Sequence, residues 1–468
     1  MVVGDFAIDL DTVVIGAGPG GYVAAIRAAE KGQKVTVIER EFIGGVCLNV
    51  GCIPSKALIE AAHRYQKAMN SADMGLRITA ATLDFKQTQT WKQESVVNKL
   101  TGGVASLFKK HKIDVIWGSA FLKDDHSLRV IKDDSAQTYT FNNLILATGS
   151  HPIEIPNFKF ENRVLDSTGA LNLQEVPKDL VVVGGGYIGC ELASVYANLG
   201  AHVSILEGTE RILANYERDL VSVVEHHFSK QKVDIYTKAM ARKAEQTADG
   251  VKITFEVAGE EKQLQADYCI VCVGRRANTA DMGLEHVGIE MDQRGLIKVD
   301  AQGRTSVSNI YAIGDIVPGA ALAHKASYEG KVAAEAISGS KAIIDYRAMP
   351  AVCYTDSEIA TTGLTMAEAK EQGLKPDKAQ FPFAANGRAI SMNSTDGFIR
   401  LVFEKESHQL LGAQIVGPNA SDLITELTLA VETGATVEDI ALTIHPHPSV
   451  SEAVMDAADV GLKLPINI

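Results

Sequence analysis

The chain is organised around the stretch Gly44-Gly45-Val46-Cys47-Leu48-Asn49-Val50-Gly51-Cys52-Ile53-Pro54-Ser55-Lys56. Its two cysteines lie five positions apart. At roughly 3.3 Å per residue, an extended chain would carry their Cα atoms far beyond the ~7 Å that a disulfide allows. They can pair only if the backbone curls, and Gly45 and Gly51 make that easier. A bond closed by such a small, strained loop is labile, which favours redox turnover over a structural role.

Two other interpretations of Cys47 and Cys52 stay open on spacing alone. They could be ordinary buried cysteines or a metal-binding pair. Metal sites usually pair cysteines two to four positions apart and need further ligands. No second cysteine pair or histidine cluster of that kind is apparent in the sequence. The remainder of the chain decides in favour of a redox dithiol.

Residues 11–40 have the pattern of a βαβ unit with a glycine-rich turn. In such a unit Gly16 makes the tight turn, Gly18 lets the backbone approach a pyrophosphate, and Gly21 lets helix and strand pack closely. The N-terminus of the helix offers free N–H groups to phosphates. Glu39 ends the second strand, where a carboxylate accepts hydrogen bonds from ribose hydroxyls. The pattern predicts a dinucleotide site.

A second fingerprint, Gly184-Gly185-Gly186-Tyr187-Ile188-Gly189, leads to a terminal acid at Glu207. The distance from first glycine to terminal acid is 23 residues here and also from Gly16 to Glu39. Two dinucleotide sites indicate an electron relay between two cofactors. A 2′-phosphate near Glu207 would be repelled by ~1 kcal/mol in water and ~4 kcal/mol at an effective dielectric of 20, so we expect NAD at the second site.

The rest of the chain supplies further elements. Residues 57–111 are predicted to be mostly helical, with a polar interruption near 71–84, and residues 113–148 to be β-structure. Ile310–Asp315 has the pattern of a strand ending in Gly-Asp, where an acid can hold a sugar or polyol hydroxyl. Ala323 is expected to open a helix. From about residue 348 alternating strands followed by helices predict a separate α+β domain.

Cys269 and Cys272 form a nominal C-x-x-C pattern inside a strand-like run. Residues three apart in a strand point to opposite faces at roughly 10 Å, so we expect neither a disulfide nor a metal site there. Cys190 is expected to be a small packed residue. Beside it, Glu191 lies early in the helix of the second fingerprint, where by itself it is a first-turn acid that the helix dipole stabilises.

Two histidines bracketed by prolines occur near the end, in His445-Pro446-His447-Pro448, and Glu452 follows His447 by five positions. The prolines fix the backbone, so a histidine here is held in place. An isolated pair would be interpreted as surface-turn histidines. Beside a redox dithiol, which needs a proton acceptor of pKa near 7, His447 becomes a candidate base.

Length and composition bound these interpretations. A chain of 468 residues is too long for one core, so two to four domains are expected. The net charge of −13 argues against nucleic acid and anionic membrane surfaces as partners, and six cysteines do not suggest a disulfide scaffold. The start, Met1–Phe6, lacks a basic n-region, and no long uncharged apolar run occurs. We therefore expect no signal peptide, no membrane span and a cytoplasmic location.

Together these motifs resemble the pyridine nucleotide–disulfide oxidoreductases, and within them the dihydrolipoamide dehydrogenases, the FAD-containing E3 components of 2-oxoacid dehydrogenase complexes. The resemblance covers essentially the whole chain. It implies an α/β fold with two Rossmann-like dinucleotide-binding domains, for FAD and NAD, plus a C-terminal α+β dimerisation domain. The implied bounds are 1–150 for the FAD-binding domain, 151–278 for the NAD-binding domain, 279–347 for a central domain completing the FAD site, and 348–468 for the dimerisation domain.

The resemblance also implies catalytic roles. Cys47 resembles the interchange thiol that meets the substrate, and Cys52 the thiol that faces the flavin. Lys56 falls at the lysine near flavin N5, with Glu191 as its ion-pair partner. The implied base is His447, oriented by Glu452.

The cofactor contacts are likewise implied by the resemblance. For FAD they are Gly16, Gly18, Gly21, Glu39, Lys56, Ala120, Asp315 and Ala323. For NAD they are Gly186, Gly189 and Glu207, and Gly274 is a further cofactor contact. The implied assembly is a homodimer in which His447 completes the partner's site, bound to the acyltransferase (E2) core that carries the lipoyl domain.

The implied reaction oxidises protein-bound dihydrolipoamide to lipoamide through Cys47 and Cys52 and FAD, and passes hydride to NAD⁺. The alternatives are a disulfide reductase for glutathione or mercuric ion, or a mainly structural flavoprotein subunit. Glutathione enzymes generally prefer NADP, which Glu207 opposes. Mercuric reductases usually carry a C-terminal cysteine pair, which residues 461–468 lack. The intact cysteine and histidine motifs argue against a purely structural subunit.

Three positions depart from the family pattern. Ala277 and Ser357 stand where the family usually has Pro, and Pro446 stands where Ala is commoner. All three changes affect turn stiffness, and only Pro446 lies near the expected chemistry, where it bears on the pose of His447.

Overall fold

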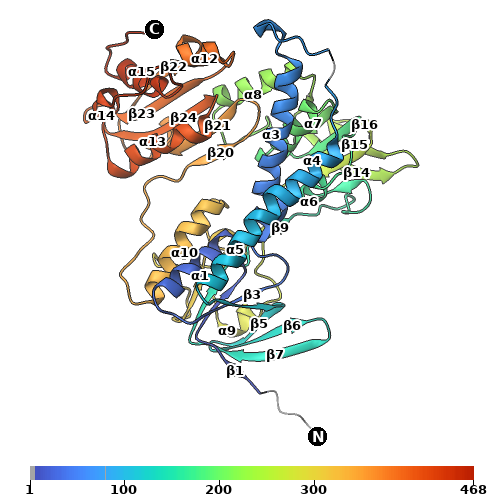
Figure 1. The fold of residues 1–468 in the computed structure, drawn as a ribbon, viewed down its shortest axis with the longest axis vertical. Helices are drawn as coiled ribbons and strands as arrows, with labels where there is room; N and C mark the ends of the chain where they lie inside the picture. Colours follow the sequence, from blue (N-terminus) through green and yellow to red (C-terminus); the bar gives the residue numbers. More distant parts are fainter. Residues whose placement is uncertain (1–5, 80) are drawn as a thin grey trace.

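The computed structural model describes residues 6–79 and 81–468, so most of the N-terminal stretch in which no signal peptide was expected lies outside it. Three α/β bodies are visible in Figure 1, with the N-terminal body at the bottom and the C-terminal body at the top left. The long helix α3 (Cys52–Met69) rises from the first body to lie beside the other two.

The first body is built on a five-stranded parallel sheet of order β19-β8-β2-β3-β4. Two of its strands, at Thr12–Ile15 and Val35–Glu39, are buried throughout, because helices cover one face of the sheet and strands of a second, antiparallel sheet pack on the other. The predicted βαβ unit is confirmed. The elements are β2 (Thr12–Ile15), α1 (Pro19–Glu30), β3 (Val35–Glu39), β4 (Asp114–Trp117), β8 (Asn143–Leu146) and β19 (Ile310–Ala312).

The segment between β3 and β8 is helical and then β-structured, as predicted. A polar stretch interrupts the helices, and a four-stranded sheet of order β1-β7-β6-β5 follows. The elements are α2 (Gly45–Val50), α3, η1 (Ala72–Met74), α4 (Phe85–Trp91), η2 (Lys92–Val97), α5 (Asn98–Lys110), β1 (Ile8–Asp9), β5 (Ser119–Asp124), β6 (Ser127–Lys132) and β7 (Ser135–Thr140).

The second body repeats the parallel design, with sheet order β10-β17-β11-β12-β13. The second fingerprint joins β11 to α7, as predicted, and Cys269 is buried within β17 as a free thiol. A three-stranded antiparallel sheet, β14-β15-β16, covers one side. The elements are β10 (Val164–Leu165), α6 (Ser167–Leu171), β11 (Asp179–Val183), α7 (Tyr187–Asn198), β12 (His202–Leu206), α8 (Arg218–Lys230), β13 (Asp234–Tyr236), β14 (Ala239–Gln246), β15 (Val251–Val257), β16 (Glu260–Ala266) and β17 (Tyr268–Val271).

After the second body, the chain returns to the first body. A two-stranded ribbon pairs β9 (Ser150–Pro152) with β18 (Arg275–Ala277) at the crossing. After α9 (Leu284–Val287) and β19, η3 (Gly314–Ile316) leads to α10 (Ala323–Ile337), which begins at the predicted residue. This helix packs tightly on α1, since a Cβ on Gly330 would lie 2.6 Å from the carbonyl oxygen of Gly20.

The third body is the predicted α+β domain. Its antiparallel sheet has order β20-β21-β24-β23-β22, and helices α13 and α15 pack on it. The elements are β20 (Ala351–Cys353), β21 (Glu358–Gly363), α11 (Met366–Glu371), β22 (Pro376–Pro382), η4 (Phe383–Ala385), α12 (Gly387–Ser391), β23 (Phe398–Glu404), β24 (Leu410–Gly417), α13 (Ala420–Thr433), α14 (Val437–Leu442) and α15 (Glu452–Gly461).

One hydrophobic cluster crosses the boundaries between the bodies. It contains buried Leu58 from α3, Val195 from α7, and Cys353 and Val416 from the third body. The three bodies are therefore held by apolar packing at the place where α3 passes between them.

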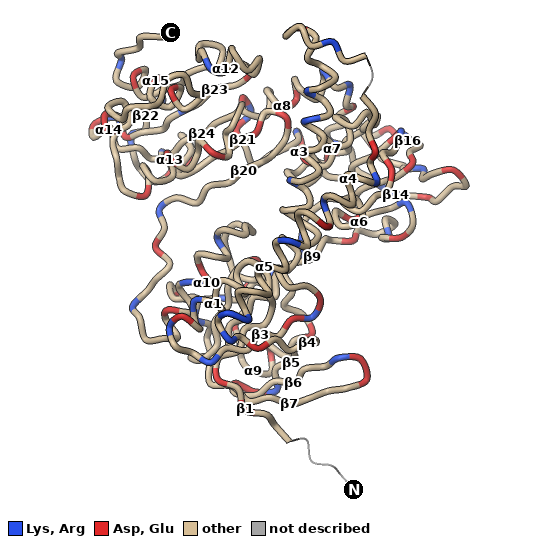
Figure 2. The backbone as a smooth tube through the Cα atoms, viewed as in Figure 1, with Lys and Arg blue, Asp and Glu red and all other residues tan. Residues whose placement is uncertain are grey.

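Charge is spread over the whole surface. Figure 2 shows acidic and basic residues interspersed along the chain, with no continuous basic tract. Among the described residues, no helix is both long enough and apolar enough to cross a bilayer.

The turn between β20 and β21 has an unusual backbone at one of the three departing positions. Ser357 has φ +56°, in the left-handed region. Proline is restricted to φ near −65°, so this turn adopts a shape that a prolyl residue at 357 cannot adopt.

We expect Ser357→Pro to lower the thermal midpoint of unfolding, with a loss of more than about 1 kcal/mol, because proline forces the turn out of its native φ. Ser357→Gly, which tolerates positive φ, is the matched control and should unfold at or above the wild-type temperature. Thermal scans at one protein concentration decide between them. An unchanged or higher midpoint for the proline variant would contradict the observed turn.

Candidate active site

The cysteine stretch packs directly on the first fingerprint. Gly44 and Gly45 have φ of +91° and +59°, and the Gly44 N–H donates to the Ala17 carbonyl at 2.9 Å. A Cβ on Gly45 would lie 2.6 Å from the Gly18 Cα. Only glycine allows both the backbone angle and the approach, so these residues place the cysteines at the predicted phosphate-binding turn.

The two cysteines lie on successive helices. Cys47 is in α2 and Cys52 begins α3, and Gly51 between them turns the chain with φ −141° and ψ −114°. The backbone therefore curls, as pairing requires. Cys47 is partly buried and Cys52 is exposed, and both are free thiols in this structure.

The two thiols are hydrogen-bonded to each other and differ in acidity. The hydrogen bond from Cys47 is the main cause that lowers the pKa of Cys52 to about 7; Lys56 acts in the same direction and burial opposes it. The same hydrogen bond, with burial, raises the pKa of Cys47. The pair is therefore set up with Cys52 as the thiolate and Cys47 as its donor, and the thiolate is the reactive form of cysteine.

Lys56 follows Cys52 by one helical turn and is paired as predicted. Its Nζ lies 2.8 Å from Glu191 Oε2, and Ser55 Oγ donates to the same oxygen at 3.4 Å. Glu191 is 3% exposed, so this carboxylate is buried because it is neutralised. Burial alone would lower the pKa of Lys56, but the Glu191 ion pair outweighs it and raises that pKa. The lysine stays positive beside Cys52.

The two terminal acids of the fingerprints make equivalent contacts. Glu39 Oε2 accepts from the Ala17 N–H at 2.6 Å, and Glu207 Oε2 accepts from the Gly185 N–H at 2.7 Å. Each carboxylate thus fixes the second residue of its own glycine turn. Glu39 also accepts from the N–H groups of Glu41 and Phe42, and Glu207 from that of Thr209. Of the about four acceptor sites of an ionised carboxylate, one therefore stays open on Glu39 and two on Glu207 for the ribose hydroxyls that the sequence predicts.

The two histidines near the C-terminus have different environments. His445 has a side chain only 4% exposed, and its Nε2 lies 3.0 Å from Glu426 Oε1, which raises the pKa of His445. His447 is 82% exposed, and its Nδ1 lies 2.8 Å from Glu452 Oε1. Glu452 also accepts from the Ser449 N–H, and that bond is the main cause of its lowered pKa. His447 is presented to the outside and oriented by an ionised carboxylate.

His447 and the dithiol are separate within one chain. Of the hydrogen bonds and ion pairs among residues 6–79 and 81–468, none joins His447 to Cys47 or Cys52. The sequence brought these groups together only through the family resemblance, and one chain by itself does not.

Comparison with known proteins identifies the family to which this arrangement belongs. Residues 10–330 match the family described as pyridine nucleotide-disulphide oxidoreductase, and residues 349–458 match its dimerisation domain.

The chain belongs to this family.

Individual relatives support the same family assignment. A dihydrolipoyl dehydrogenase of Geobacillus stearothermophilus is 59% identical over 468 residues, which cover 100% of this chain and 99% of the relative. One of Bacillus subtilis strain 168 is 60% identical over 469 residues and covers 100% of both. Among solved structures, LpdA of Mycobacterium tuberculosis has a TM-score of 0.90 at 26% identity, with 96% of this chain and 99% of that chain covered. The flavoprotein disulfide reductase RclA of Escherichia coli has a TM-score of 0.86 at 29% identity, with the same coverage.

As a member of this oxidoreductase family, the chain uses FAD and NAD, which confirms the predicted cofactors. The glycine turns fit such groups. A Cβ on Gly186 would meet nothing within 4 Å, and one on Gly18 would meet only the Gly45 Cα at 3.9 Å. These two residues are the N-caps of α7 and α1. Each helix N-terminus therefore has open space in front of it, as a pyrophosphate site requires.

The other predicted cofactor residues lie on three separate elements. Ala120 is half-buried in β5, Ala323 begins α10, and Gly274 has φ +135° just before β18. The glycines of close packing behave as the fingerprint requires. A Cβ on Gly21 would lie 1.8 Å from the Gly16 oxygen, and one on Gly189 would lie 2.0 Å from the Gly184 oxygen. The contacts of these residues with FAD and NAD remain predictions.

Asp315 lies in a network that the sequence did not reveal. Ser150 Oγ donates to Asp315 Oδ2 at 2.6 Å, and Arg275 Nε donates to the same hydroxyl at 2.8 Å. Both partners come from the β9–β18 ribbon. The Asp315 carboxylate is thereby held in η3, just after β19, and its other oxygen accepts no hydrogen bond from the side chains that the structure describes.

A buried ion pair also holds the backbone of Gly314, the residue before Asp315. Lys325 Nζ lies 2.7 Å from Glu329 Oε1, with side chains 1% and 4% exposed. The Gly314 N–H donates to Glu329 at 2.8 Å, and the Gly314 carbonyl accepts from Lys325 at 3.3 Å. Both backbone polar groups of Gly314 are bound by one ion pair. The i,i+4 spacing of Lys325 and Glu329 was the available sequence signal.

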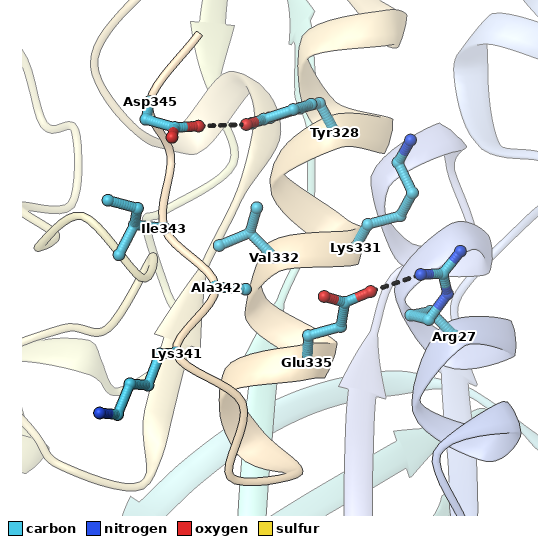
Figure 3. Close-up of a pocket in the computed structure, with 9 residues that line it drawn as sticks. All are labelled: Arg27, Tyr328, Lys331, Val332, Glu335, Lys341, Ala342, Ile343 and Asp345. Atoms are coloured by element: carbon cyan, nitrogen blue, oxygen red, sulfur yellow. Dashed lines mark hydrogen bonds and ion pairs between the residues drawn. The ribbon is translucent and has the colours of Figure 1, made fainter.

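A surface pocket of about 460 Å³ is lined by none of the dithiol, glycine-turn or histidine residues described above (Figure 3). It is lined by α10, by Arg27 of α1 and by the segment 341–345. Figure 3 shows two contacts among the residues that line it, an ion pair of Arg27 with Glu335 and a hydrogen bond of Tyr328 with Asp345. The pocket contains none of the redox residues.

We expect Gly45→Ala to reduce the FAD content of the purified protein and its thermal midpoint, because the added Cβ drives the cysteine stretch away from the fingerprint. Gly32→Ala is the matched control, since Gly32 also has positive φ, +90°, but a Cβ there meets nothing within 4 Å. The ratio of flavin to protein absorbance measures the loss. Equal FAD content in the two variants would show that backbone strain, and not the close approach, is responsible.

Proposed function

We propose that this chain is a dihydrolipoyl dehydrogenase that oxidises dihydrolipoamide carried on a lipoyl domain and reduces NAD⁺. The observation that carries the proposal is the Cys47–Cys52 pair, hydrogen-bonded and backed by Lys56, on the first dinucleotide fingerprint. Relatives of that name, 59% and 60% identical over the full length, support it.

In the oxidised protein Cys47 and Cys52 form a disulfide. His447 takes the proton of one substrate thiol, and the resulting thiolate attacks Cys47 Sγ, which breaks the disulfide and releases Cys52 as a thiolate. The second substrate thiol passes its proton to Cys47 Sγ as its sulfur attacks the substrate sulfur of the mixed disulfide, which closes the lipoyl ring and releases Cys47 as a thiol, while His447 keeps the first proton. The substrate loses two electrons and the enzyme disulfide gains them. The hydrogen bond from Cys47 and the charge of Lys56 stabilise the thiolate at Cys52.

FAD held at the first fingerprint would supply the electron transfer between the dithiol and an NAD⁺ held at the second. The chain holds the groups in place. We assign the FAD contacts to Gly16, Gly18, Gly21, Glu39, Lys56, Ala120, Asp315 and Ala323, and the NAD contacts to Gly186, Gly189 and Glu207, with Gly274 beside them. The carboxylate of Glu207 favours NAD over NADP by repelling a 2′-phosphate.

The base acts across a homodimer. His447 is 82% exposed and lies in the dimerisation domain. Large apolar side chains of the same domain are uncovered in one chain, Leu429 at 63%, Leu442 at 81% and Ile444 at 95% exposed. An apolar patch of this kind marks a protein interface. A second copy that covers it would bring His447 to the partner's dithiol.

The proposed organisation follows from these assignments. Residues 1–150 and 279–347 bind FAD, residues 151–278 bind NAD, and residues 348–468 form the dimer. The assembly partner is the acyltransferase (E2) core of a 2-oxoacid dehydrogenase complex, and the location is the cytoplasm.

We expect Cys47→Ser to abolish dihydrolipoamide oxidation, with a fall of more than about 10³-fold, because the substrate thiolate has no sulfur to attack. FAD absorbance should persist. Cys269→Ala, in buried β17, is the control and should turn over close to the wild type. Wild-type rates with dihydrolipoamide and with glutathione disulfide, under both NAD and NADP couples, complete the test. Retained lipoamide activity in Cys47→Ser, or a preference for glutathione disulfide, would contradict the proposal.

Mixed dimers decide where His447 acts. A dimer of one Cys47→Ser chain and one His447→Gln chain, isolated with two affinity tags, keeps one intact site if each site uses both chains. We expect about half of the wild-type turnover per dimer, since one of two sites is complete. Both parent homodimers serve as controls and should be nearly inactive. A mixed dimer as inactive as its parents would place His447 and the dithiol of one chain in the same site.

A further inference from the structure

We propose that Tyr354 is a positioning residue of the redox centre. Its ring holds the Lys56 ammonium against Glu191, so that the positive charge stays beside Cys52. The inference rests on the proposed function and deepens it, because it concerns how the same dithiol is kept in its reactive form.

The three groups form one contact set. Lys56 Nζ lies over the Tyr354 ring, 4.5 Å from its centroid, and 2.8 Å from Glu191 Oε2. The other Glu191 oxygen accepts from the Tyr354 backbone N–H at 3.0 Å. The carboxylate thus fixes the backbone of Tyr354 and the head group of Lys56 together. An ammonium at this distance is attracted to the negative face of the ring.

The ring, and not the hydroxyl, makes this contact. No hydrogen bond of the Tyr354 hydroxyl occurs among the described residues, and burial raises the pKa of this phenol, so it stays neutral. The aromatic side chain also packs against the hydrophobic cluster that joins the three bodies. Phenylalanine would therefore preserve the contact with Lys56.

The turn that carries Tyr354 is held in place by side-chain contacts of Asp356, two residues further along the chain. Asp356 Oδ1 lies 2.6 Å from His63 Nε2 of α3. Its Oδ2 accepts from Asn198 of α7 at 2.8 Å and from Gln231 at the end of α8 at 2.7 Å. These contacts hold the turn of the dimerisation domain between helices of the other two bodies. Tyr354 has one fixed position, and it fixes Lys56 in turn.

The electrostatic consequence falls on Cys52. The charged and titratable groups that interact with it are the Cys47 thiol on α2, Lys56 on its own helix, and Glu191 and Tyr187 on α7. Lys56 favours the thiolate and Glu191 opposes it. If Lys56 moves away from the pair, Glu191 remains and the thiolate is disfavoured. Tyr354 therefore links docking of the dimerisation domain to the state of the dithiol.

Titration of the Cys52 thiolate in the reduced holoenzyme tests the proposal. Alkylation by iodoacetamide is followed over a pH series, and the modified Cys52 peptide is quantified by mass spectrometry. The wild-type midpoint should lie near the pKa of about 7. Tyr354→Leu should raise it by roughly half a pH unit or more. Tyr354→Phe, which keeps the ring, is the rescue variant and should match the wild type. Tyr354→Met replaces the leucine variant if that one folds poorly.

A double-mutant cycle separates positioning from a general structural effect. Lys56→Met should raise the midpoint alone, and adding Tyr354→Leu to it should change nothing further. Equal midpoints in Tyr354→Leu, Tyr354→Met and wild type would overturn the proposal, and so would an undiminished shift in the Lys56→Met background. Dihydrolipoamide turnover of the wild type is measured in parallel. Its absence would refute the proposed function, while the thiol titration would still decide the role of Tyr354.

Discussion

The structure depends on one close approach, that of the Gly45 backbone to the Gly18 backbone, with no side chain between them. Through it the cysteine stretch and the phosphate-binding turn form a single unit, and the Gly44–Ala17 hydrogen bond fixes their register. A protein that passes electrons between sulfur and a flavin must hold both at a constant distance. Two adjacent glycines achieve this with backbone alone, so no rotamer change can loosen it.

Glu191 extends the same unit to the rest of the molecule. One oxygen binds Lys56 and the other binds the Tyr354 backbone, so a single buried carboxylate joins elements of all three bodies. A charge buried this deeply is tolerated only because it is paired and hydrogen-bonded. All three bodies must therefore be in place before Glu191 is fully paired. The redox chemistry is thereby linked to correct assembly of the whole chain.

Local patterns in the sequence were sufficient to predict much of this fold and site. Both βαβ units and the strand that leads to Gly314 and Asp315 follow from spacings within one element or turn, although that strand ends at Ala312, earlier than expected. The orienting role of Glu452 toward His447 came from the family resemblance. Contacts between distant segments could not be predicted, because no periodicity relates Ser150 to Asp315 or Tyr354 to Lys56. The two histidines show the limit clearly. Both have a proline neighbour in the sequence, yet the side chain of His445 is buried beside Glu426 while that of His447 is exposed beside Glu452.

The order of strands in the first sheet has a consequence for biosynthesis. Strand β19, at one edge of that sheet, is formed by residues 310–312, yet its neighbour β8 ends at residue 146. A growing polypeptide therefore leaves β8 unpaired on one side while the whole second body is translated. Since the second body is continuous in sequence from residue 164 to 271, it can complete its own sheet first. The N-terminal half must wait, exposed to chaperones, until the ribosome has delivered the last strand.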